Sequence, residues 1–408
     1  MKKFWDKWTE IALVKRILVG LILGAILGIA VPQATGIAIL GDVFVSALKA
    51  IAPLLVFFLV ISSLCNAGKS HGGVIKTVII LYMFSTVLAA VIAVFASMAF
   101  PVKMTLANAA TDTSAPQGIV EVLNNLLLNV VANPVSSLVN ANYVGILMWA
   151  VLLGLAFRAA DKMTKKVLAD VADGISMVVT WIINLAPFGI FGLVFNTVST
   201  NGLDIFTTYG KLLVLLVGCM LFIYFVTNPL LVYWCIRQNP YPLIFQCLKR
   251  SALTAFFTRS SAANIPVNMK VCEEMGLDRD TYSVTIPLGA TINMDGAAIT
   301  ITVMTMATAF TLGIHVDIPT AIILSLLAAL SACGASGVAG GSLLLIPMAC
   351  SLFGISDDIS MQVVAVGFII GVVQDSVETA LNSSSDLLLS ASAEFRQWRL
   401  EGKEIKFK

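Results

Sequence analysis

Eight stretches of this sequence are long and apolar enough to cross a membrane as helices: residues 12–31, 43–66, 75–100, 135–157, 170–196, 208–236, 281–311 and 361–392. A membrane-spanning helix needs about 20 predominantly apolar residues, and only helices or closed barrels satisfy their backbone hydrogen bonds in lipid. Charged residues make up 12% of the 408 residues, against about 25% in soluble domains. We therefore expect an all-α, polytopic membrane protein whose fourth span is broken by Asn and Pro residues in its lead-in, 119–142.

Two further segments, residues 243–272 and 319–353, are apolar at both ends and interrupted in the middle. The first is interrupted by Thr-Arg-Ser-Ser at 258–261, and the second by a glycine-rich run at 334–342. Non-helical backbone at membrane depth is tolerated only where protein or a water-filled cavity satisfies it. Each segment therefore predicts a re-entrant hairpin of two half-helices.

Basic residues support this layout. With the N-terminus inside and each hairpin returning to its side of entry, 21 of the 25 Lys and Arg residues fall on cytoplasmic ends. Lys103 and Lys211 lie outside, and Lys49 and Arg259 lie within segments. This distribution follows the positive-inside rule and predicts cytoplasmic N- and C-termini. Each hairpin precedes an acid-bearing span and the two units enter from opposite sides, which is the pattern of an inverted repeat.

Four carboxylates lie inside the apolar stretches: Asp295, Asp375, Glu378 and Asp386. Unpaired, they would cost roughly 10–14 kcal/mol on insertion scales. One alternative is purely structural: the acids pair with one another and with Arg259, and protonation silences some of them. Because one arginine cannot neutralise four acids, we expect further positive ligands.

The last span carries a polar stripe. At about 100° per residue, Asp375, Thr379, Asn382 and Asp386 fall within roughly 60° of one another, and Glu378 lies at the edge. The opposite face of this helix is apolar. Such a stripe indicates a helix that lines a cavity.

The run Asn-Met-Asp-Gly at 293–296 is a poor helix interior and predicts an unwound turn. Carboxylate, amide and carbonyl oxygens suit hard cations, while half-helix N-termini at the hairpin tips would offer N–H groups to a carboxylate. Together these groups predict a site for a zwitterion and a cation. The oxygen-rich turn favours Na⁺, and His71 and His315 fall in loops, but carboxylates alone can carry protons, so H⁺ stays open.

Two other classes of function deserve comparison. Gly-Ala-Ser-Gly at 334–337 matches a serine-nucleophile pattern, but no histidine lies in a predicted span to activate it. No Gly-x-Gly-Asp run of an aspartyl intramembrane protease is present, so we do not expect an enzyme. A channel is the third option; the broken hairpins favour alternating access instead, and a secondary anion leak stays open. We expect no nucleic-acid partner.

The motifs at 258–261, 293–296 and 336–341, with Asp375, Asn382 and Asp386, resemble those of the dicarboxylate/amino acid:cation symporter family, which includes glutamate transporters. The resemblance spans residues 12–392. It implies an elevator-type glutamate-transporter fold of eight transmembrane helices and two re-entrant hairpins, in a homotrimer in the bacterial cytoplasmic membrane.

The resemblance also implies a division of the chain. A fixed scaffold would comprise residues 1–73 and 102–205, a moving transport domain would comprise 74–101 and 206–393, and 394–408 would form a cytoplasmic tail.

Three Na⁺ sites would follow from the same resemblance. One would use Asp386 with carbonyls of Gly289, Asn293 and Asn382. A second would use carbonyls near Thr291 and from Ala332, Cys333 and Ala335. The third would use Tyr82, Ser85, Thr86, Asn293 and Asp295.

The substrate would lie between the hairpins and the last two spans. Its contacts would come from Arg259, Ser260, Ser261, Ala297, Val338, Asp375, Glu378, Thr379 and Asn382. Asp375 would receive the amino group, whereas Ser260 and Ser261 are equally consistent with helix-tip caps.

Two departures from the family pattern bear on the substrate. Acidic-substrate members have arginine at the position of Glu378, and a threonine is usual at the position of Ala297. A side-chain carboxylate would meet repulsion at Glu378, which we expect to pair with Arg259 instead. We therefore expect sodium-coupled import of serine and threonine; the alternative is sodium- or proton-coupled symport of acidic or other neutral amino acids, such as aspartate or alanine.

Overall fold

The computed structural model describes residues 13–66, 73–106, 131–202, 205–333 and 340–405, together with Ile11, Leu128 and Ala335. This part of the chain is helical and contains no β-strand. Up to residue 202 its α-helices are α2 (Leu13–Ala30), α3 (Ile39–Asn66), α4 (Gly73–Ala99), α6 (Pro134–Val139), α7 (Tyr143–Ala156), α8 (Lys162–Asn184) and α9 (Ala186–Asn201).

From residue 205 onward, the α-helices are α10 (Ile205–Phe222), α11 (Asn228–Ile236), α12 (Tyr241–Cys247), α13 (Leu253–Thr258), α14 (Ser261–Glu274), α15 (Arg279–Ile292), α16 (Asp295–Thr311), α17 (Ile318–Ala332), α18 (Ile346–Ser351) and α19 (Asp357–Leu400). Short 3₁₀ turns are η1 (Thr35–Ala38), η2 (Phe157–Ala159) and η5 (Gly341–Leu345). Two π-helical turns, η3 (Ile223–Thr227) and η4 (Leu248–Ala252), join α10 to α11 and α12 to α13.

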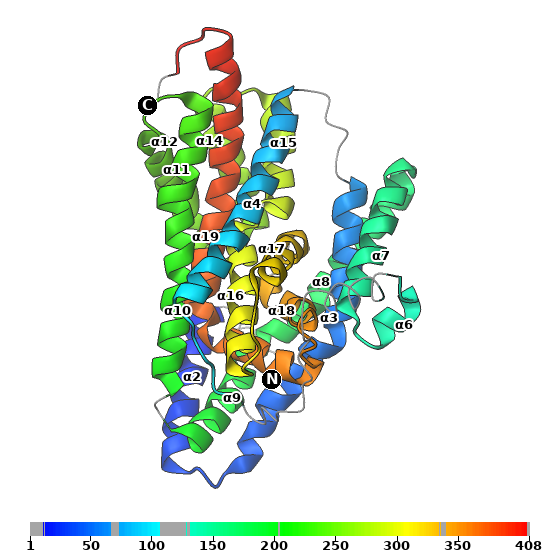
Figure 1. Cartoon of the computed structure of the whole chain (residues 1–408), viewed down its shortest axis with the longest axis vertical. Coiled ribbons are helices and arrows are strands. Elements are labelled where there is room, and N and C mark those ends of the chain that lie inside the picture. Colours follow the sequence, from blue (N-terminus) through cyan, green and yellow to red (C-terminus); the bar gives the residue numbers. More distant parts are fainter. Residues whose placement is uncertain are drawn as a thin grey trace.

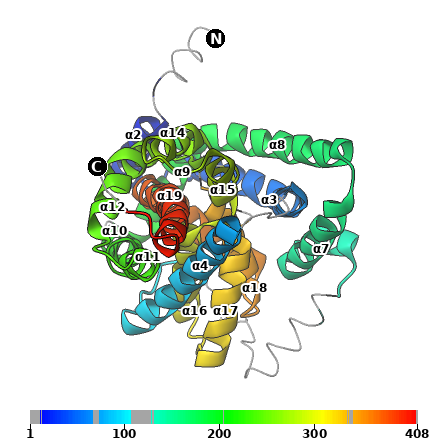
Figure 2. The ribbon, with the colours of Figure 1, turned by 90° about the horizontal axis from the view of Figure 1, so that it is seen from above.

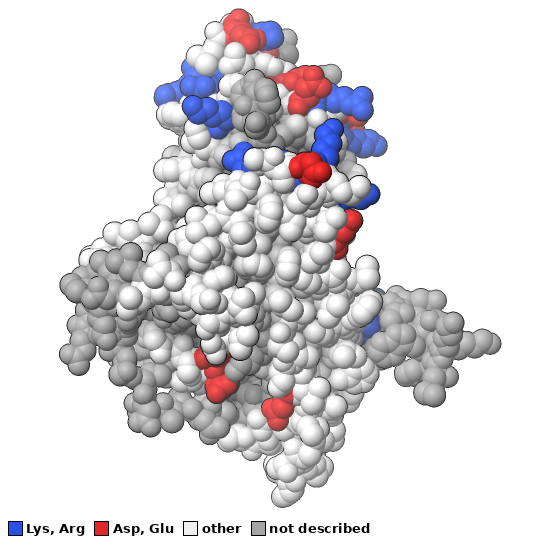
Figure 3. All heavy atoms as spheres, turned by 90° about the vertical axis from the view of Figure 1, so that its right-hand side faces the viewer, with Lys and Arg blue, Asp and Glu red and all other residues white. Residues whose placement is uncertain are grey.

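The surface is that of a membrane protein. Six helical stretches of the described chain are long and apolar enough to cross a bilayer. Large apolar side chains such as Trp181, Val214 and Leu230 are more than half exposed, which lipid tolerates and water does not. Figure 3 shows Lys and Arg gathered at one end of the molecule, above a wide band nearly free of charge. The expectation of a multi-pass, all-helical membrane protein is therefore confirmed.

The helices pack in two groups. The first helix group contains α2, α3, α7, α8 and α9, which pack mainly on one another. The second helix group contains α4 and the helices from α10 to α19. In the second group α19 runs through the middle, contacting α10, α11, α13, α14, α15 and α16 along its length (Figures 1 and 2). Few contacts join the two groups, and most of those involve α19, α18 or η5.

Close packing of α2 on α9 depends on three glycines spaced four residues apart: Gly20, Gly24 and Gly28. At Gly20, an added β-carbon would lie 2.2 Å from the carbonyl oxygen of Pro187. At Gly24, it would lie 2.5 Å from the carbonyl oxygen of Phe191. Glycine at these positions lets the two backbones approach, as small residues do between membrane helices.

The predicted single span at 170–196 is wrong. The chain there forms two helices, α8 and α9, which meet at Leu185. Pro187 occupies the first turn of α9, where a missing N–H is harmless, but inside a continuous helix it would remove a hydrogen bond and clash with the preceding turn. Seen from above, α8 lies nearly side-on along one edge of the molecule (Figure 2).

Both interrupted segments are divided into separate helices. The first hairpin turns at Arg259, which has a left-handed backbone (φ 53°), before α14 begins. In the second, α17 is followed by η5 and α18, while most of the glycine-rich tip lies outside the described residues. The predicted unwound turn at 293–296 is a break at Asn293 and Met294, between α15 and α16.

We expect Gly20→Ala to destabilise the protein by about 2 kcal/mol or more, because its β-carbon would meet backbone that cannot rotate away. The measurement is the thermal unfolding midpoint of the purified protein in detergent. Gly210→Ala in α10 is the matched control: its β-carbon would meet no atom within 4 Å, so its midpoint should be unchanged or slightly raised. Equal midpoints for both variants would contradict the role given to the α2–α9 glycines.

Candidate substrate and cation site

All four carboxylates are buried in the second helix group. Asp295 begins α16, and Asp375, Glu378 and Asp386 lie on α19. Among the described residues, only one salt bridge reaches any of them, the pair between Arg259 and Asp375. The other three are held by hydroxyl and amide groups. Polar side chains from α4, α16, α19 and both hairpins therefore converge on this region.

Asp295 lies against α4. Its Oδ2 accepts a hydrogen bond from the Ser85 hydroxyl at 2.7 Å, and its Oδ1 lies 3.2 Å from the Thr86 hydroxyl. The Met294 N–H donates to Thr86 Oγ1 at 3.2 Å, which fixes the break between α15 and α16 on α4. Ser85 and Thr86, two members of the third expected Na⁺ site, thus both contact the Asp295 carboxylate.

Asp386 lies against the end of α15. Its Oδ1 accepts a hydrogen bond from the Asn293 amide at 2.9 Å, and its backbone carbonyl accepts one from the Tyr82 hydroxyl at 2.8 Å. A β-carbon at Gly289 would lie 2.8 Å from the Asp386 carboxyl carbon, so glycine is required for this approach. Asp386 Oδ2 and Asn293 Oδ1 are buried and have no hydrogen-bond partner among the described residues.

These two clusters fit a hard cation. Their donor atoms are carboxylate, amide, hydroxyl and carbonyl oxygens, and the two unpartnered oxygens are acceptors that a cation would satisfy. No group of three or more His, Cys, Asp or Glu that could hold a transition metal occurs in the described ranges. The chemistry thus favours Na⁺ over zinc or iron.

The second predicted cation site is only loosely assembled. Cys333 Sγ lies 3.8 Å from the carbonyl oxygen of Ile292, so the end of α17 adjoins the break after α15. The Thr291 hydroxyl donates to its own helix at Leu288. Ala335 N–H donates to the carbonyl of Ala332 at 2.9 Å. Proximity of the two elements is clear, but no side chain identifies a ligand.

Asp375 is the point where the two hairpins meet. Its Oδ2 accepts hydrogen bonds from Arg259 Nε at 2.7 Å and Nη2 at 2.6 Å, from the first hairpin tip. Its Oδ1 accepts one at 3.3 Å from the N–H of Gly340, in the second hairpin. The carboxylate expected to receive a substrate amino group therefore already holds both hairpins to α19.

The expectation that Glu378 pairs with Arg259 is wrong. Arg259 is engaged by Asp375, and Glu378 points toward α16 and the second hairpin instead. Its Oε2 accepts hydrogen bonds from Thr300 at 2.7 Å, Ser342 at 2.9 Å and Gln374 at 2.5 Å. Sequence spacing alone could not tell which of two acids, three residues apart on one helix, would meet the arginine.

Of the remaining predicted substrate contacts, one caps a helix and four are buried. Ser260 caps α14, because its hydroxyl accepts from the Ala263 N–H at 3.2 Å. Ser261, Ala297, Thr379 and Asn382 are buried, and Asn382 Oδ1 accepts from the Gly296 N–H at 2.7 Å.

Val338, the last predicted substrate contact, lies outside the described residues.

Several polar residues of the site were missed from sequence. Gln374, Thr300 and Ser342 surround Glu378, and Asn228 lies between Ser385, to which it donates at 3.0 Å, and Ser85, 3.5 Å away. Gln374 could have been found, since it lies one helical turn before Glu378. Asn228 could not, because the π-helical turn η3 just before it shifts the register of the helix face.

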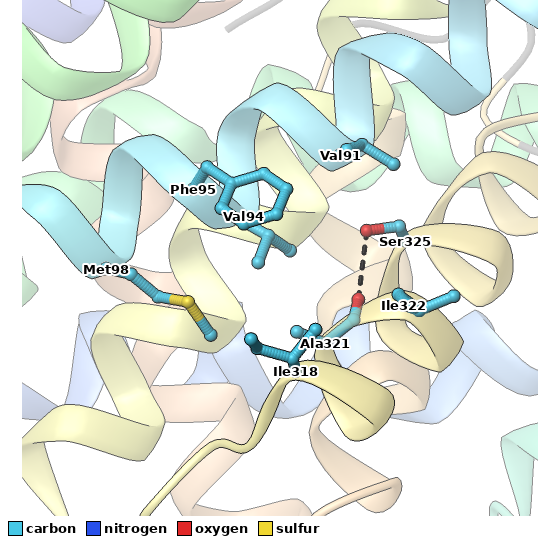
Figure 4. Close-up of a pocket in the computed structure, with 8 residues that line it drawn as sticks. All are labelled: Val91, Val94, Phe95, Met98, Ile318, Ala321, Ile322 and Ser325. Carbon is cyan, nitrogen blue, oxygen red and sulfur yellow. Dashed lines mark hydrogen bonds between the residues drawn. The ribbon is translucent and has the colours of Figure 1, made fainter.

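Two apolar cavities lie away from these carboxylates. A space of about 20 Å³ lies between α4 and α17. Its one polar lining side chain, Ser325, donates to the carbonyl oxygen of Ala321 in the same helix (Figure 4). A wider groove of about 1040 Å³ lies between α4 and α10, and its lining is mostly apolar, with Lys211 as its one charged residue. Neither cavity is lined by a carboxylate that could receive an ammonium group, so the carboxylate cluster is the better candidate site.

Broken helices whose ends converge on buried oxygens are typical of ion-coupled secondary transporters. The chain belongs to the sodium:dicarboxylate symporter family, whose model matches residues 13–394. This confirms the resemblance drawn from the motifs, and with it the expectation of a transporter rather than an enzyme.

Several curated relatives are similar to this chain over nearly its whole length. A Bifidobacterium adolescentis protein named serine/threonine transporter SstT is 57% identical to it, over 98% of this chain and 93% of that protein. A protein of the same name from Streptococcus thermophilus is 55% identical, over 98% of this chain and 100% of its own length. Another from Streptococcus agalactiae is 57% identical, over 97% of this chain and 98% of its own length.

Proposed function

We propose that this protein is a sodium-coupled symporter that imports serine and threonine across the bacterial cytoplasmic membrane. The observation that carries the substrate assignment is the pairing of Arg259 with Asp375. This salt bridge is the only one that reaches the four carboxylates within the described residues, so no second cation faces Glu378. A substrate with a side-chain carboxylate would lack a partner there, whereas a small neutral amino acid would not. The names of the relatives support the same substrates.

The cation sites follow from the clusters around Asp386 and Asp295. Na⁺ at Asp386 would be bound with the carbonyls of Gly289, Asn293 and Asn382, and its charge would satisfy the unpartnered Asp386 Oδ2. Na⁺ at Asp295 would use Tyr82, Ser85, Thr86 and Asn293. The second site, from carbonyls near Thr291, Ala332, Cys333 and Ala335, completes the proposed set.

The substrate would lie between the hairpin tips and α19. Its ammonium would approach Asp375, whose Oδ1 accepts a single hydrogen bond from the described residues, at 3.3 Å from the Gly340 N–H. Its carboxylate would meet the N-terminal N–H groups of α14. Ser261, Ala297, Val338, Thr379 and Asn382 would line the remaining space. Arg259 and Ser260 would shape the first tip rather than bind the side chain.

Movement would occur between the two helix groups. We assign the first group to a fixed scaffold (residues 1–73 and 102–205) and the second to a transport domain (74–101 and 206–393) that slides past it. The sparse contacts between the groups are consistent with such sliding. The scaffold would form a homotrimer, and the basic end of the molecule, where α19 ends, would face the cytoplasm. Both termini would lie on the cytoplasmic side of the membrane.

Reconstituted into proteoliposomes, the protein should take up serine when an inward Na⁺ gradient is imposed. Uptake should cease when an ionophore collapses the gradient, and a proton gradient alone should not drive it. Excess threonine should compete, whereas excess aspartate should not, because no cationic side chain among the described residues is left to bind its second carboxylate. Aspartate uptake comparable to serine uptake would overturn the substrate assignment.

Glu378→Arg should weaken serine uptake by roughly ten-fold or more and admit aspartate, because a guanidinium can bind a carboxylate through two hydrogen bonds. The measurement is competition by aspartate against labelled serine. Glu394→Gln, a buried carboxylate near the end of the same helix, is the control and should leave selectivity unchanged. If Glu378→Arg retained the wild-type selectivity, Glu378 would not line the substrate site.

A further inference from the structure

Glu378 is held by one oxygen only. Oε2 receives three hydrogen bonds from three different elements: Thr300 in α16, Ser342 in η5 and Gln374 in α19. Gln374 Nε2 also donates to Thr300 Oγ1 at 2.8 Å, so the Thr300 hydroxyl proton is directed at Glu378. The three donors thus form a connected network around a single carboxylate oxygen.

The other oxygen, Oε1, accepts no hydrogen bond from the described residues. It is also not one of the fully buried oxygens that lack a partner, and the residue keeps 5% of its surface exposed. Glu378, which lies between Asp375 and Thr379 along α19, therefore has one oxygen saturated by protein donors and one oxygen that is open to a ligand.

Close packing of the α16 backbone on α19 brings the donors near the Glu378 carboxylate. A β-carbon at Gly296 would lie 2.9 Å from the Glu378 Cα, so α16 and α19 touch through a glycine. Thr300 lies one helical turn beyond Gly296 on α16, which brings its hydroxyl to the Glu378 carboxylate. The network is thus built on two helices in direct backbone contact.

We propose that Thr300, Ser342 and Gln374 are positioning residues that aim Glu378 Oε1 at the hydroxyl group of a β-hydroxy amino acid. The inference rests on the proposed function and adds how serine and threonine are distinguished from alanine. A hydroxyl suits this role because it can donate to a carboxylate or accept from a carboxylic acid. Alanine would leave the open oxygen without a partner, and sites that hydrogen-bond a substrate hydroxyl reject analogues that lack it.

Ser342→Ala and Thr300→Val each remove one donor to Oε2 without touching the substrate. We expect the KM for serine to rise about ten-fold in each variant while the KM for alanine changes little, since a hydrogen bond to a carboxylate contributes about this factor. The measurement is competition by unlabelled serine and alanine against labelled serine in proteoliposomes. Serine affinity of the purified protein, by calorimetry in NaCl, should fall in parallel.

Controls separate positioning from folding. Thr302→Val removes a buried hydroxyl from the same helix that has no partner among the described residues, and it should leave the serine-to-alanine ratio unchanged. Thr300→Ser keeps the donor and should restore the wild-type ratio. A purely structural role would raise both KM values together.

Equal rises for serine and alanine in Ser342→Ala and Thr300→Val would overturn the inference. So would a wild-type protein that binds alanine as tightly as serine, even though sodium-driven serine uptake would then still stand. Absence of sodium-driven serine uptake in the wild type would instead refute the proposed function itself.

Discussion

Four carboxylates buried among apolar helices must each be compensated by donors or cations, and their donors come from α4, α16, α19 and both hairpins. Asp375 meets it with Arg259 and so ties the first hairpin to α19, while the Gly340 N–H brings the second hairpin to the same carboxylate. Glu378 meets it with three neutral donors. Asp386 meets it only in part, since one of its oxygens is buried and has no partner in the part of the chain that the structure describes.

The extent to which each carboxylate is hydrogen-bonded distinguishes the roles that we propose for the acids. A carboxylate oxygen whose hydrogen bonds are complete, such as Glu378 Oε2, needs no ligand. A carboxylate with an unpartnered buried oxygen is stabilised by an added cation, as we propose for Asp386 and the adjacent Asn293 amide. Coupling would then follow from electrostatics: Na⁺ completes the site, and the completed site binds the zwitterion.

Much of this arrangement was predictable from the sequence because it depends on local signals. Apolar length predicted a helical membrane protein, and Asn-Met-Asp-Gly at 293–296 predicted the break between α15 and α16. The sequence did not predict which side chains would pair when the two partners lie on helices far apart in the chain. Spacing on α19 gave no means to assign Arg259 to Asp375 rather than Glu378, and the Thr300 and Ser342 contacts depend on tertiary packing. The break at Leu185 was missed because apolar composition outweighed a single proline in the prediction.

The most direct test of the central claim is calorimetric binding of serine to the purified protein in NaCl and in choline chloride. We expect binding in NaCl and none in choline, with Asp386→Asn shifting the required Na⁺ concentration upward because an amide compensates the cation less well than a carboxylate. Equal serine affinity in the two salts would contradict the claim that Na⁺ completes this site.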